Sequence, residues 1–389
     1  MNIYALVDCD SFFVSCEQKV NPELKNKPVC VLSNKDGCVI SRSKEAKKMG
    51  VRMGQPYFMA KREFPDAIYI SCHHDLYGEI SEQVMNLLKE FSPKVQVYSI
   101  DEAFVDLTGL KRLYNKKDYI ELATFIKEEV LKRLDIPVSI GISSTKTLAK
   151  LASDKAKKTS TGIFSINKDN LQTVLTNTPI EEIWGIGRNL TLRCKKSGIL
   201  SAKDLTEKDD IWLDKTFGIH GKEMKHELLG EIVSPIINEE QLPKSIQKTS
   251  AFGIFTSDLD YIKNQLNYHI HSACRKLRKV DCKANVIGVM VRTKDFKVYY
   301  DKIALTVPTS FEMEISDIAF KLLENIYNPN ILYRSTGVIL ENLRCNCEEQ
   351  LFLFTDSNIE EKKEKLSQCF DKLENKFGKN IVQIGFTEN

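Results

Sequence analysis

Residues 5–10 read Ala-Leu-Val-Asp-Cys-Asp and residues 98–106 read Tyr-Ser-Ile-Asp-Glu-Ala-Phe-Val-Asp, so two apolar segments of this chain contain acidic residues. Each run of apolar and β-branched residues is typical of a buried or half-buried β-strand. A carboxylate that is buried without a partner costs free energy, so such acids are usually neutralised by a cation or by a raised pKa. The two segments therefore predict strands whose acidic side chains need a neutralising partner.

The second segment also has the pattern of a hairpin, with its turn near residues 100–102. If the first strand lies beside this hairpin, Asp8, Asp101 and Glu102 converge on one point. Three hard oxygen ligands at one point suit Mg²⁺, and two such ions roughly 3.5–4 Å apart form the arrangement used in phosphoryl and nucleotidyl transfer. The alternative is that the three acids are unrelated strand ends that face water.

The composition bounds the class of protein. A chain of 389 residues is too long for a single core, so we expect two to four domains. Met1 is followed directly by a predicted strand, no apolar run is long enough to cross a bilayer, and the eleven cysteines are scattered without a C-x-x-C motif. We expect a cytoplasmic, monomeric protein with reduced thiols and no membrane contact. A net charge of +3 does not by itself argue for nucleic-acid binding.

Two local patches are strongly basic. Residues 145–158 contain five lysines and one aspartate, and their spacing predicts a helix with Leu148 and Leu151 inward and Lys146, Lys150 and Lys157 toward the surface. A second patch, between residues 275 and 302, has nine basic residues against three acidic ones and includes Arg275, Arg278, Arg292 and Lys294. Such patches can follow a phosphate backbone, or they can be solvated faces with no partner.

A glycine-containing turn gives a more specific signal. Residues 183–187 read Ile-Trp-Gly-Ile-Gly and precede a predicted helix over 188–196, which is the pattern of a helix-hairpin-helix. Glycines in such a turn let backbone N–H groups approach a DNA phosphate without obstruction by side chains. We therefore expect DNA contacts from Gly185, Ile186, Gly187 and Arg188, with a looser second copy at residues 217–221. An ordinary helical turn is the alternative.

The organisation along the chain predicts an α+β multidomain protein. Residues 1–163 alternate strands and helices around the acidic segments, and residues 164–235 are helical. A proline-bracketed linker follows over 236–247. The order from there to residue 346 is β-α-β-β-α-β, a small α+β unit, and an amphipathic helix is predicted over 359–377.

Five motifs then occur in an order that is typical of one family. They are residues 8–13 (Asp-Cys-Asp-Ser-Phe-Phe), 32–40 (Leu-Ser-Asn-Lys-Asp-Gly-Cys-Val-Ile), 98–104 (Tyr-Ser-Ile-Asp-Glu-Ala-Phe), 141–150 (Gly-Ile-Ser-Ser-Thr-Lys-Thr-Leu-Ala-Lys) and 184–187 (Trp-Gly-Ile-Gly). With them, the whole length resembles the Y-family (translesion) DNA polymerases, and their UmuC branch more than their DinB branch. The resemblance implies a right-hand polymerase with a palm (1–10 and 74–163), fingers (11–73), a helical thumb (164–235), a linker (236–247), a little finger (248–346) and a clamp-binding peptide with a tail (347–389).

The resemblance also implies roles for individual residues. Asp8, Asp101 and Glu102 would be the metal-binding carboxylates for two Mg²⁺ ions, with the main-chain carbonyl of Cys9 as a further ligand. Phe13 would be the steric gate that excludes a ribose 2′-OH by a built-in clash, while core packing is the simpler role for its neighbour in the pocket, Phe12. The nucleotide-binding residues would be Phe12, Phe13, Ser41, Lys44, Lys47 and Lys157. At positions 44 and 47 the DinB branch typically has tyrosine and arginine, and lysine is a less directional phosphate ligand than arginine.

The implied activity is template-directed, error-prone lesion bypass without proofreading, on primer-template DNA with dNTPs. Residues 350–354 (Gln-Leu-Phe-Leu-Phe) resemble a bacterial sliding-clamp motif, with Gln350, Leu351, Leu353 and Phe354 as anchors, although a final edge strand is the alternative. A UmuD-like accessory subunit or a recombinase filament are further partners that this branch can use. Two other classes stay open: a nucleotide cyclase-like enzyme and a non-catalytic DNA-binding scaffold.

Overall fold

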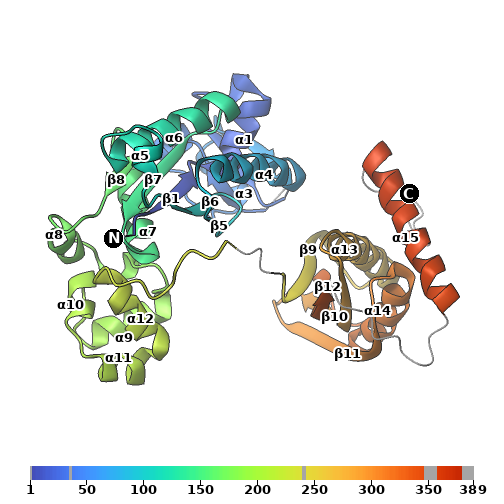
Figure 1. Cartoon of the computed structure of the whole chain (residues 1–389). Coiled ribbons are helices and arrows are strands. Elements are labelled where there is room, and N and C mark those ends of the chain that lie inside the picture. The colour runs from blue at the N-terminus through green and yellow to red at the C-terminus, as the bar shows by residue number, and fades with distance from the viewer. Residues whose placement is uncertain (1, 35–36, 239–241, 346–356, 379–389) are drawn as a thin grey trace. The chain divides into compact units, whose positions relative to one another are not determined.

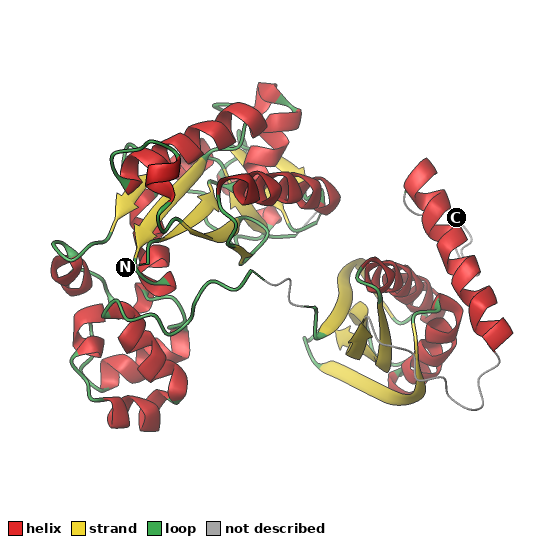
Figure 2. Cartoon of the chain, in the orientation of Figure 1, coloured by secondary structure: helices red, strands yellow, loops and turns green. Residues whose placement is uncertain are grey.

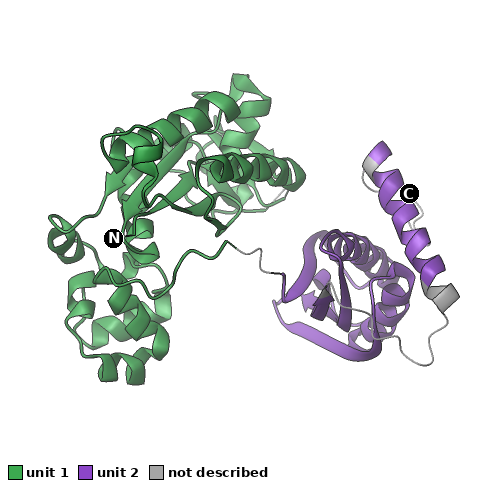
Figure 3. Cartoon of the chain, viewed as in Figure 1, with its two compact units in different colours: residues 1–239 green, residues 240–389 purple. Residues whose placement is uncertain are grey.

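The structure is a computed structural model that describes residues 2–34, 37–238, 242–345 and 357–378. The chain divides into two compact units, residues 1–239 and residues 240–389 (Figure 3). The proposed clamp motif at 350–354 lies outside the described residues. Within the described part of the chain, no helix is both long enough and apolar enough to cross a membrane.

A five-stranded sheet forms the centre of the first unit (Figure 1). Its strand order is β5 (Val95–Val97), β6 (Glu102–Asp106), β1 (Tyr4–Cys9), β7 (Val138–Ser143) and β8 (Ile163–Ser165). The predicted first strand therefore does lie beside the second acidic segment. β1 runs antiparallel to both β6 and β7, and in this register Asp8 is directly opposite Glu102 on one side and Ser139 on the other.

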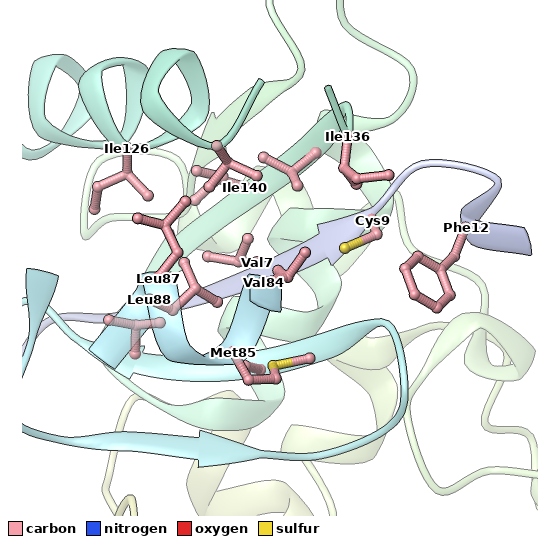
Figure 4. Close-up of a cluster of buried hydrophobic side chains, with 14 of the residues drawn as sticks. Val7, Cys9, Phe12, Val84, Met85, Leu87, Leu88, Ile126, Ile136 and Ile140 are labelled. Atoms are coloured by element: carbon pink, nitrogen blue, oxygen red, sulfur yellow. The ribbon is translucent and has the colours of Figure 1, made fainter. Parts of the chain in front are cut away.

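Alternate residues of β1 face opposite sides of the sheet, as the pleat requires. Val7 and Cys9 lie in the larger core, packed with helices α4 (His74–Phe91) and α6 (Tyr119–Leu134) (Figure 4). Leu6 lies in a separate small cluster with Phe104 and Ala149. Asp8 therefore shares the face of Leu6, which is covered by α7 (Lys146–Ala156) and not by α4 and α6. The short helix α5 (Leu110–Leu113) follows β6.

Helix α7 packs closely against β7. A Cβ atom added at Gly141 would lie 2.0 Å from the Ser153 nitrogen and 2.4 Å from the Ala149 oxygen. The absence of a side chain at Gly141 thus lets the backbone of α7 approach the sheet, and this approach fixes where the lysines of α7 lie relative to Asp8.

A three-stranded sheet with its own small core follows β1. Its strand order is β3 (Val39–Arg42), β2 (Val29–Leu32), β4 (Ile68–Ser71), and it is accompanied by helices α1 (Phe12–Val20), η1 (Pro22–Leu24), α2 (Lys44–Met49) and α3 (Tyr57–Glu63). The core contains Cys30, Leu32, Val39, Ala46, Val51 and Ala60. Only Asp10 and Ser11 separate the end of β1 from the start of α1. This two-residue turn therefore leads from the five-stranded sheet to the three-stranded sheet and its helices.

The rest of the first unit is helical (Figure 2). It contains α8 (Leu171–Thr176), η2 (Ile180–Glu182), α9 (Arg188–Lys196), α10 (Ala202–Thr206), α11 (Asp210–Phe217) and α12 (Ile219–Leu228). Gly185 and Gly218 occupy the two predicted turns with φ angles of 92° and 72°, a region that glycine enters without steric cost. Both turns join helices, as the sequence pattern predicts.

The second unit has the predicted β-α-β-β-α-β order. Its sheet runs β11 (Val298–Thr309), β10 (Cys282–Thr293), β12 (Tyr333–Cys345), β9 (Ser245–Thr256), and helices α13 (Leu259–Lys279) and α14 (Glu312–Ile326) pack on it. The core joins residues such as Ile270 and Leu323 from the helices with Val289 and Val291 from β10.

Helix α15 (Ser357–Phe377) docks on α13 through charged groups. The Arg278 guanidinium donates to both oxygens of Asp371 at 2.8 and 2.7 Å, and His271 Nε2 lies 2.7 Å from Glu374 Oε1. His271 Nδ1 lies 3.0 Å from Glu312 of α14, so one imidazole links three helices. Within the part of the chain that the structure describes, eight cysteines have free thiols, but Cys282 is disulfide-bonded, so the expectation of reduced thiols throughout is wrong at that residue.

Candidate active site

Asp8 and Glu102 form the centre of the candidate site. They are opposite each other in adjacent strands, and Asp8 is only 3% exposed, while the Glu102 side chain is 12% exposed. The alternative that these two acids are unrelated strand ends facing water is therefore wrong. Carboxylates directly opposite in a strand pair repel each other when both are charged, so the pair needs a neutralising partner.

Two lysines supply positive charge to this pair. Lys157 Nζ, just beyond the end of α7, lies 2.6 Å from Asp8 Oδ2. Lys150 Nζ, two helical turns earlier, is in hydrogen-bond contact with Glu102 Oε1 and lies 3.8 Å from Asp8 Oδ2. Both lysines are thus brought to the carboxylates by the same helix.

The electrostatics of the pair follow from its burial. Burial, together with the hydrogen bond to Glu102, raises the pKa of Asp8 well above its ordinary range. Burial acts in the same direction on Glu102, but hydrogen bonds from Asp8 and Lys150 outweigh it and hold the pKa of Glu102 below its usual value. The two pKa values are therefore shifted in opposite directions, which is the expected response of two acids that share a buried position.

Asp101 lies next to this pair along the backbone, but its side chain has a different partner. The Cys9 N–H donates to the Asp101 carbonyl at 2.9 Å, while the Asp101 carboxylate accepts a hydrogen bond from Ser99 Oγ at 2.5 Å. Among the described residues, no three His, Cys, Asp or Glu side chains are gathered closely enough to hold a metal ion. The structure therefore joins Asp8 and Glu102 directly and places Asp101 at the edge of the pair.

The donor chemistry of this point fits a divalent cation such as Mg²⁺. Asp8 and Glu102 offer hard oxygen atoms, and Asp101 is one residue from Glu102 in the same turn. Positive charge at this point is required in any case, because two lysines balance the two carboxylates here. The Cys9 side chain is 2% exposed in the core on the other face, so only its main chain is available to the site.

The predicted gate residue, Phe13, lies on α1 against a buried ring. Its ring stacks on that of Tyr77, with the centroids 4.6 Å apart and an interplanar angle of 21°. Tyr77 is fully buried, and its hydroxyl donates to Glu17 Oε1 at 2.6 Å. Phe12 is 3% exposed and belongs to the core, as its simpler role predicts.

The other predicted nucleotide ligands lie on the smaller sheet and its helix. Ser41 is buried on β3, whereas Lys44 and Lys47 are exposed on α2. Burial lowers the pKa of Lys127, the charge of Asp10 opposes this effect, and the charge of Lys44 adds to it.

The glycine turn at 185–187 presents its backbone outward. Gly185, Gly187 and Arg188 are exposed, while Ile186 is 8% exposed and packs into the helical core. Trp184, immediately before the turn, donates from Nε1 to the Tyr98 hydroxyl at 2.9 Å. Of the four residues predicted to contact DNA here, Ile186 anchors the turn by its side chain.

The basic residues of the second unit fall into two groups. Arg278 on α13 is paired with Asp371, and Arg275 Nε lies 3.4 Å from Glu374 Oε2, so both guanidinium groups face α15. Arg292 alternates with buried residues of β10 and so lies on the sheet face opposite α13 and α14. Exposed Lys294 follows it, with Nζ 5.6 Å from the ring centroid of Phe255.

Sequence reasoning missed two residues that the structure brings to this region. Lys150 contacts both carboxylates, and its spacing of seven residues from Lys157 was the available signal. Glu227 of α12 is 4% exposed and accepts from the N–H groups of Thr147, Val233 and Ser234 at 3.0–3.1 Å. No local pattern marks Glu227, because its partners are distant in the sequence.

Comparisons with known proteins identify the family of this chain. A model of the impB/mucB/samB family matches residues 7–154, and a model of that family's C-terminal domain matches residues 243–353. Protein UmuC of Salmonella typhimurium is 35% identical over 98% of this chain and 92% of its own length. DNA polymerase IV of Dehalococcoides mccartyi is 31% identical over 98% of this chain and 96% of its own length.

Solved structures define the class. The Y-family DNA polymerase chimera Dbh-Dpo4(243-245)-Dbh superimposes with a TM-score of 0.76 at 30% identity, covering 88% of this chain and all of that one. An insertion ternary complex of Dbh DNA polymerase gives a TM-score of 0.62 at 29% identity with the same coverage. The fold is thus that of a Y-family, translesion-type DNA polymerase, a class of metal-dependent nucleotidyltransferases. Within this class, the chain belongs to the impB/mucB/samB family and is similar to UmuC.

Proposed function

We propose that this DNA polymerase adds dNTPs to a primer 3′-OH under the direction of a template, with two Mg²⁺ ions bound by Asp8, Asp101, Glu102 and the Cys9 carbonyl. The observation that carries the proposal is the buried pair of Asp8 and Glu102, held opposite each other by strand register. A structural role alone does not account for two acids at a position where an apolar pair would be more stable.

When bound, the ions would supply Lewis-acid activation of the attacking hydroxyl and neutralisation of phosphate charge. The protein residues prepare this point. Asp8 and Glu102 would hold the ions through their ionised carboxylates, in place of their present contacts with Lys157 and Lys150. Lys157, whose side chain is 39% exposed, is then available to a triphosphate oxygen on the solvent side.

Phe13 would discriminate between sugars. Its ring rests flat on buried Tyr77, so it cannot retreat to make room for a ribose 2′-OH. Ser41, Lys44 and Lys47 would line the triphosphate path, as the sequence resemblance implies. Lysine charges at 44 and 47 attract the phosphates but do not impose the bidentate geometry of arginine.

The domain boundaries proposed from the sequence assign DNA contacts to two regions. In the thumb, the exposed backbone of Gly185 and Gly187 with Arg188 would hold a DNA phosphate. In the little finger, Arg292 and Lys294 are the better placed of the proposed contacts, because Arg275 and Arg278 are paired with α15.

The proposed clamp peptide, residues 350–354, would raise the local concentration of the enzyme at the primer end. A UmuD-like subunit or a recombinase filament are further proposed partners. The absence of proofreading is proposed from the sequence.

The test is primer extension with Mg²⁺ and single dNTPs, comparing the wild type with the Asp101→Ala, Glu102→Ala double variant. Asp106→Asn, on the same strand, is a matched control, because Asp106 Oδ1 accepts from the Thr108 N–H and an asparagine retains that acceptor. We expect templated extension by the wild type and the control, and none by the double variant. DNA binding without extension by the wild type would favour a scaffold, and a cyclic product from NTP alone would favour a cyclase.

A further inference from the structure

The glycine turn and the acidic turn are joined by one pair of aromatic residues. Trp184 Nε1 donates to the Tyr98 hydroxyl at 2.9 Å, and the two rings meet edge to face with centroids 5.3 Å apart and an interplanar angle of 86°. Trp184 directly precedes Gly185 in the proposed DNA-binding turn. Tyr98 begins the turn that contains Asp101 and ends at Glu102.

Tyr98 is attached to the acidic turn by its backbone as well. The N–H groups of Tyr98 and Ser99 both donate to the Glu102 carbonyl, at 2.9 and 3.1 Å. Ser99 in turn holds the Asp101 carboxylate. A displacement of the Tyr98 ring is therefore transmitted within four residues to both Asp101 and Glu102.

A third ring, Phe104, fixes the position of this contact. Its centroid lies 5.8 Å from those of both Tyr98 and Trp184, and Phe104 is 1% exposed in the core of the sheet. Core packing explains Phe104, but it does not explain the other two residues in full. Tyr98 is 46% exposed, so its burial contributes little, and the bond between its hydroxyl and the indole N–H is directional.

We propose that Trp184 and Tyr98 are positioning residues that couple the seating of DNA at the glycine turn to the position of Asp101 and Glu102. DNA backbone bound at residues 185–187 fixes Trp184, and Trp184 fixes the acidic turn through Tyr98. The inference rests on the proposed polymerase function. According to this inference, the pair affects the rate of nucleotide addition and does not affect the affinity for DNA.

The first experiment is a double-mutant cycle measured by single-turnover nucleotide addition. Trp184→Phe removes the indole donor and Tyr98→Phe removes its hydroxyl partner, while both variants keep an aromatic ring. Either variant loses the hydrogen bond between the two aromatic side chains. We therefore expect the rate constant of nucleotide addition to fall roughly two- to tenfold in each. The double variant should be no slower than the slower single variant, because all three lack the same bond. The dissociation constant for primer-template DNA should stay unchanged.

Trp212→Phe is the matched control. Trp212 is the other tryptophan of the chain and contacts Phe217 edge to face at 5.7 Å inside the helical region, without reaching the acidic turn. Its substitution should leave the rate constant of addition at the wild-type value. Losses that multiply in the double variant, or a loss confined to DNA affinity, would overturn the coupling.

A second readout does not depend on turnover. In the Trp212→Phe background, Trp184 is the single tryptophan, so its fluorescence reports on the contact with Tyr98. We expect Mg²⁺ added to the complex with primer-template DNA to change this fluorescence, and Tyr98→Phe to abolish the change. An identical Mg²⁺ response in both backgrounds would overturn the coupling. If the wild type fails to extend primers but the fluorescence response depends on Tyr98, the proposed function fails and the coupling stands.

Discussion

The ammonium group of Lys157 lies 2.6 Å from the carboxylate of Asp8, so a residue near the C-terminal end of α7 neutralises an acid in the middle of the sheet. Lys150 stands on the same helix and contacts Glu102. The two carboxylates and their two lysines form a compensated group of charges. Strands β1 and β6 carry the two carboxylates, and α7 with its C-terminal cap carries the two lysines.

Replacement of Lys157 by glutamine should therefore impair catalysis more than stability. Loss of a cation that contacts a transferred phosphate is expected to lower kcat/KM for the dNTP by about 10²-fold. Steady-state primer extension with one dNTP measures the effect. Lys158→Gln is the control, since Lys158 is exposed and adjacent, and equal losses in the two variants would contradict a specific role for Lys157.

Replacement of Phe13 by alanine should weaken the exclusion of ribonucleotides. Without the ring, the space above Tyr77 can hold a 2′-OH, and removal of a steric clash of this kind is worth on the order of ten- to a hundredfold in selectivity. The ratio of kcat/KM for dNTP and rNTP measures it. Tyr77→Phe keeps the stacked support of the gate and loses only the hydrogen bond to Glu17, so its ratio should stay close to that of the wild type.

Replacement of Gly141 by alanine should destabilise the first unit. The new methyl group would lie 2.0 Å from the Ser153 nitrogen, so α7 has to move away from β7, at a cost of about 1–3 kcal/mol in the free energy of unfolding. Thermal unfolding followed by circular dichroism measures the loss. Gly78→Ala is the matched control, because no atom lies within 4 Å of its added Cβ in α4, and alanine there should raise stability by up to about 1 kcal/mol.

The docking of α15 should depend on pH. The Glu312 carboxylate raises the pKa of His271 above its ordinary value of 6.5, against the effect of burial, and Glu374 adds to the rise. A raised pKa in the folded state means that the stabilisation is fully present below pH 6.5 and is lost as the pH rises through the folded pKa. Hydrogen exchange of the α15 amides, corrected for the intrinsic rate, should therefore accelerate on the alkaline side.

His271→Gln should remove this alkaline dependence. His269 provides an internal contrast, because burial lowers its pKa to about 4, and its contribution is lost as the pH falls from 6.5 toward 4. On the acidic side, the pH dependence of hydrogen exchange should therefore be the same in the wild type and in His271→Gln. An unchanged alkaline side in the variant would show that His271 does not control the docking of α15.

Local patterns in the sequence predicted the strands, the hairpin and the order of the second unit. The bounds of a strand follow less directly from side-chain patterns. The third strand of that unit, β11, runs over Val298–Thr309, and its exposed N-terminal residues pair with β10 without alternating burial. Backbone pairing of this kind leaves no periodic signal in the side chains.

The candidate site was predicted where it depended on strand register and missed where it depended on distant contacts. Lys146 was expected at the surface, yet it is 5% exposed, because Gln96 accepts from its Nζ at 3.1 Å and the Phe104 ring lies 5.7 Å below. These partners belong to the neighbouring strands and not to the helix. Helical periodicity therefore places Leu148 and Leu151 correctly but cannot place Lys146.

The alternation along β1 has a consequence for how this chain can vary between relatives. Val7 and Cys9 fill the core on one face while Asp8 belongs to the site on the other. Insertion or deletion of a single residue in this strand would exchange the two faces, burying a charge among Leu87 and Ile126 and removing it from Glu102. Such a change would disrupt the core and the candidate site together. Relatives of this chain can therefore vary β1 by substitution but not by a change in its length.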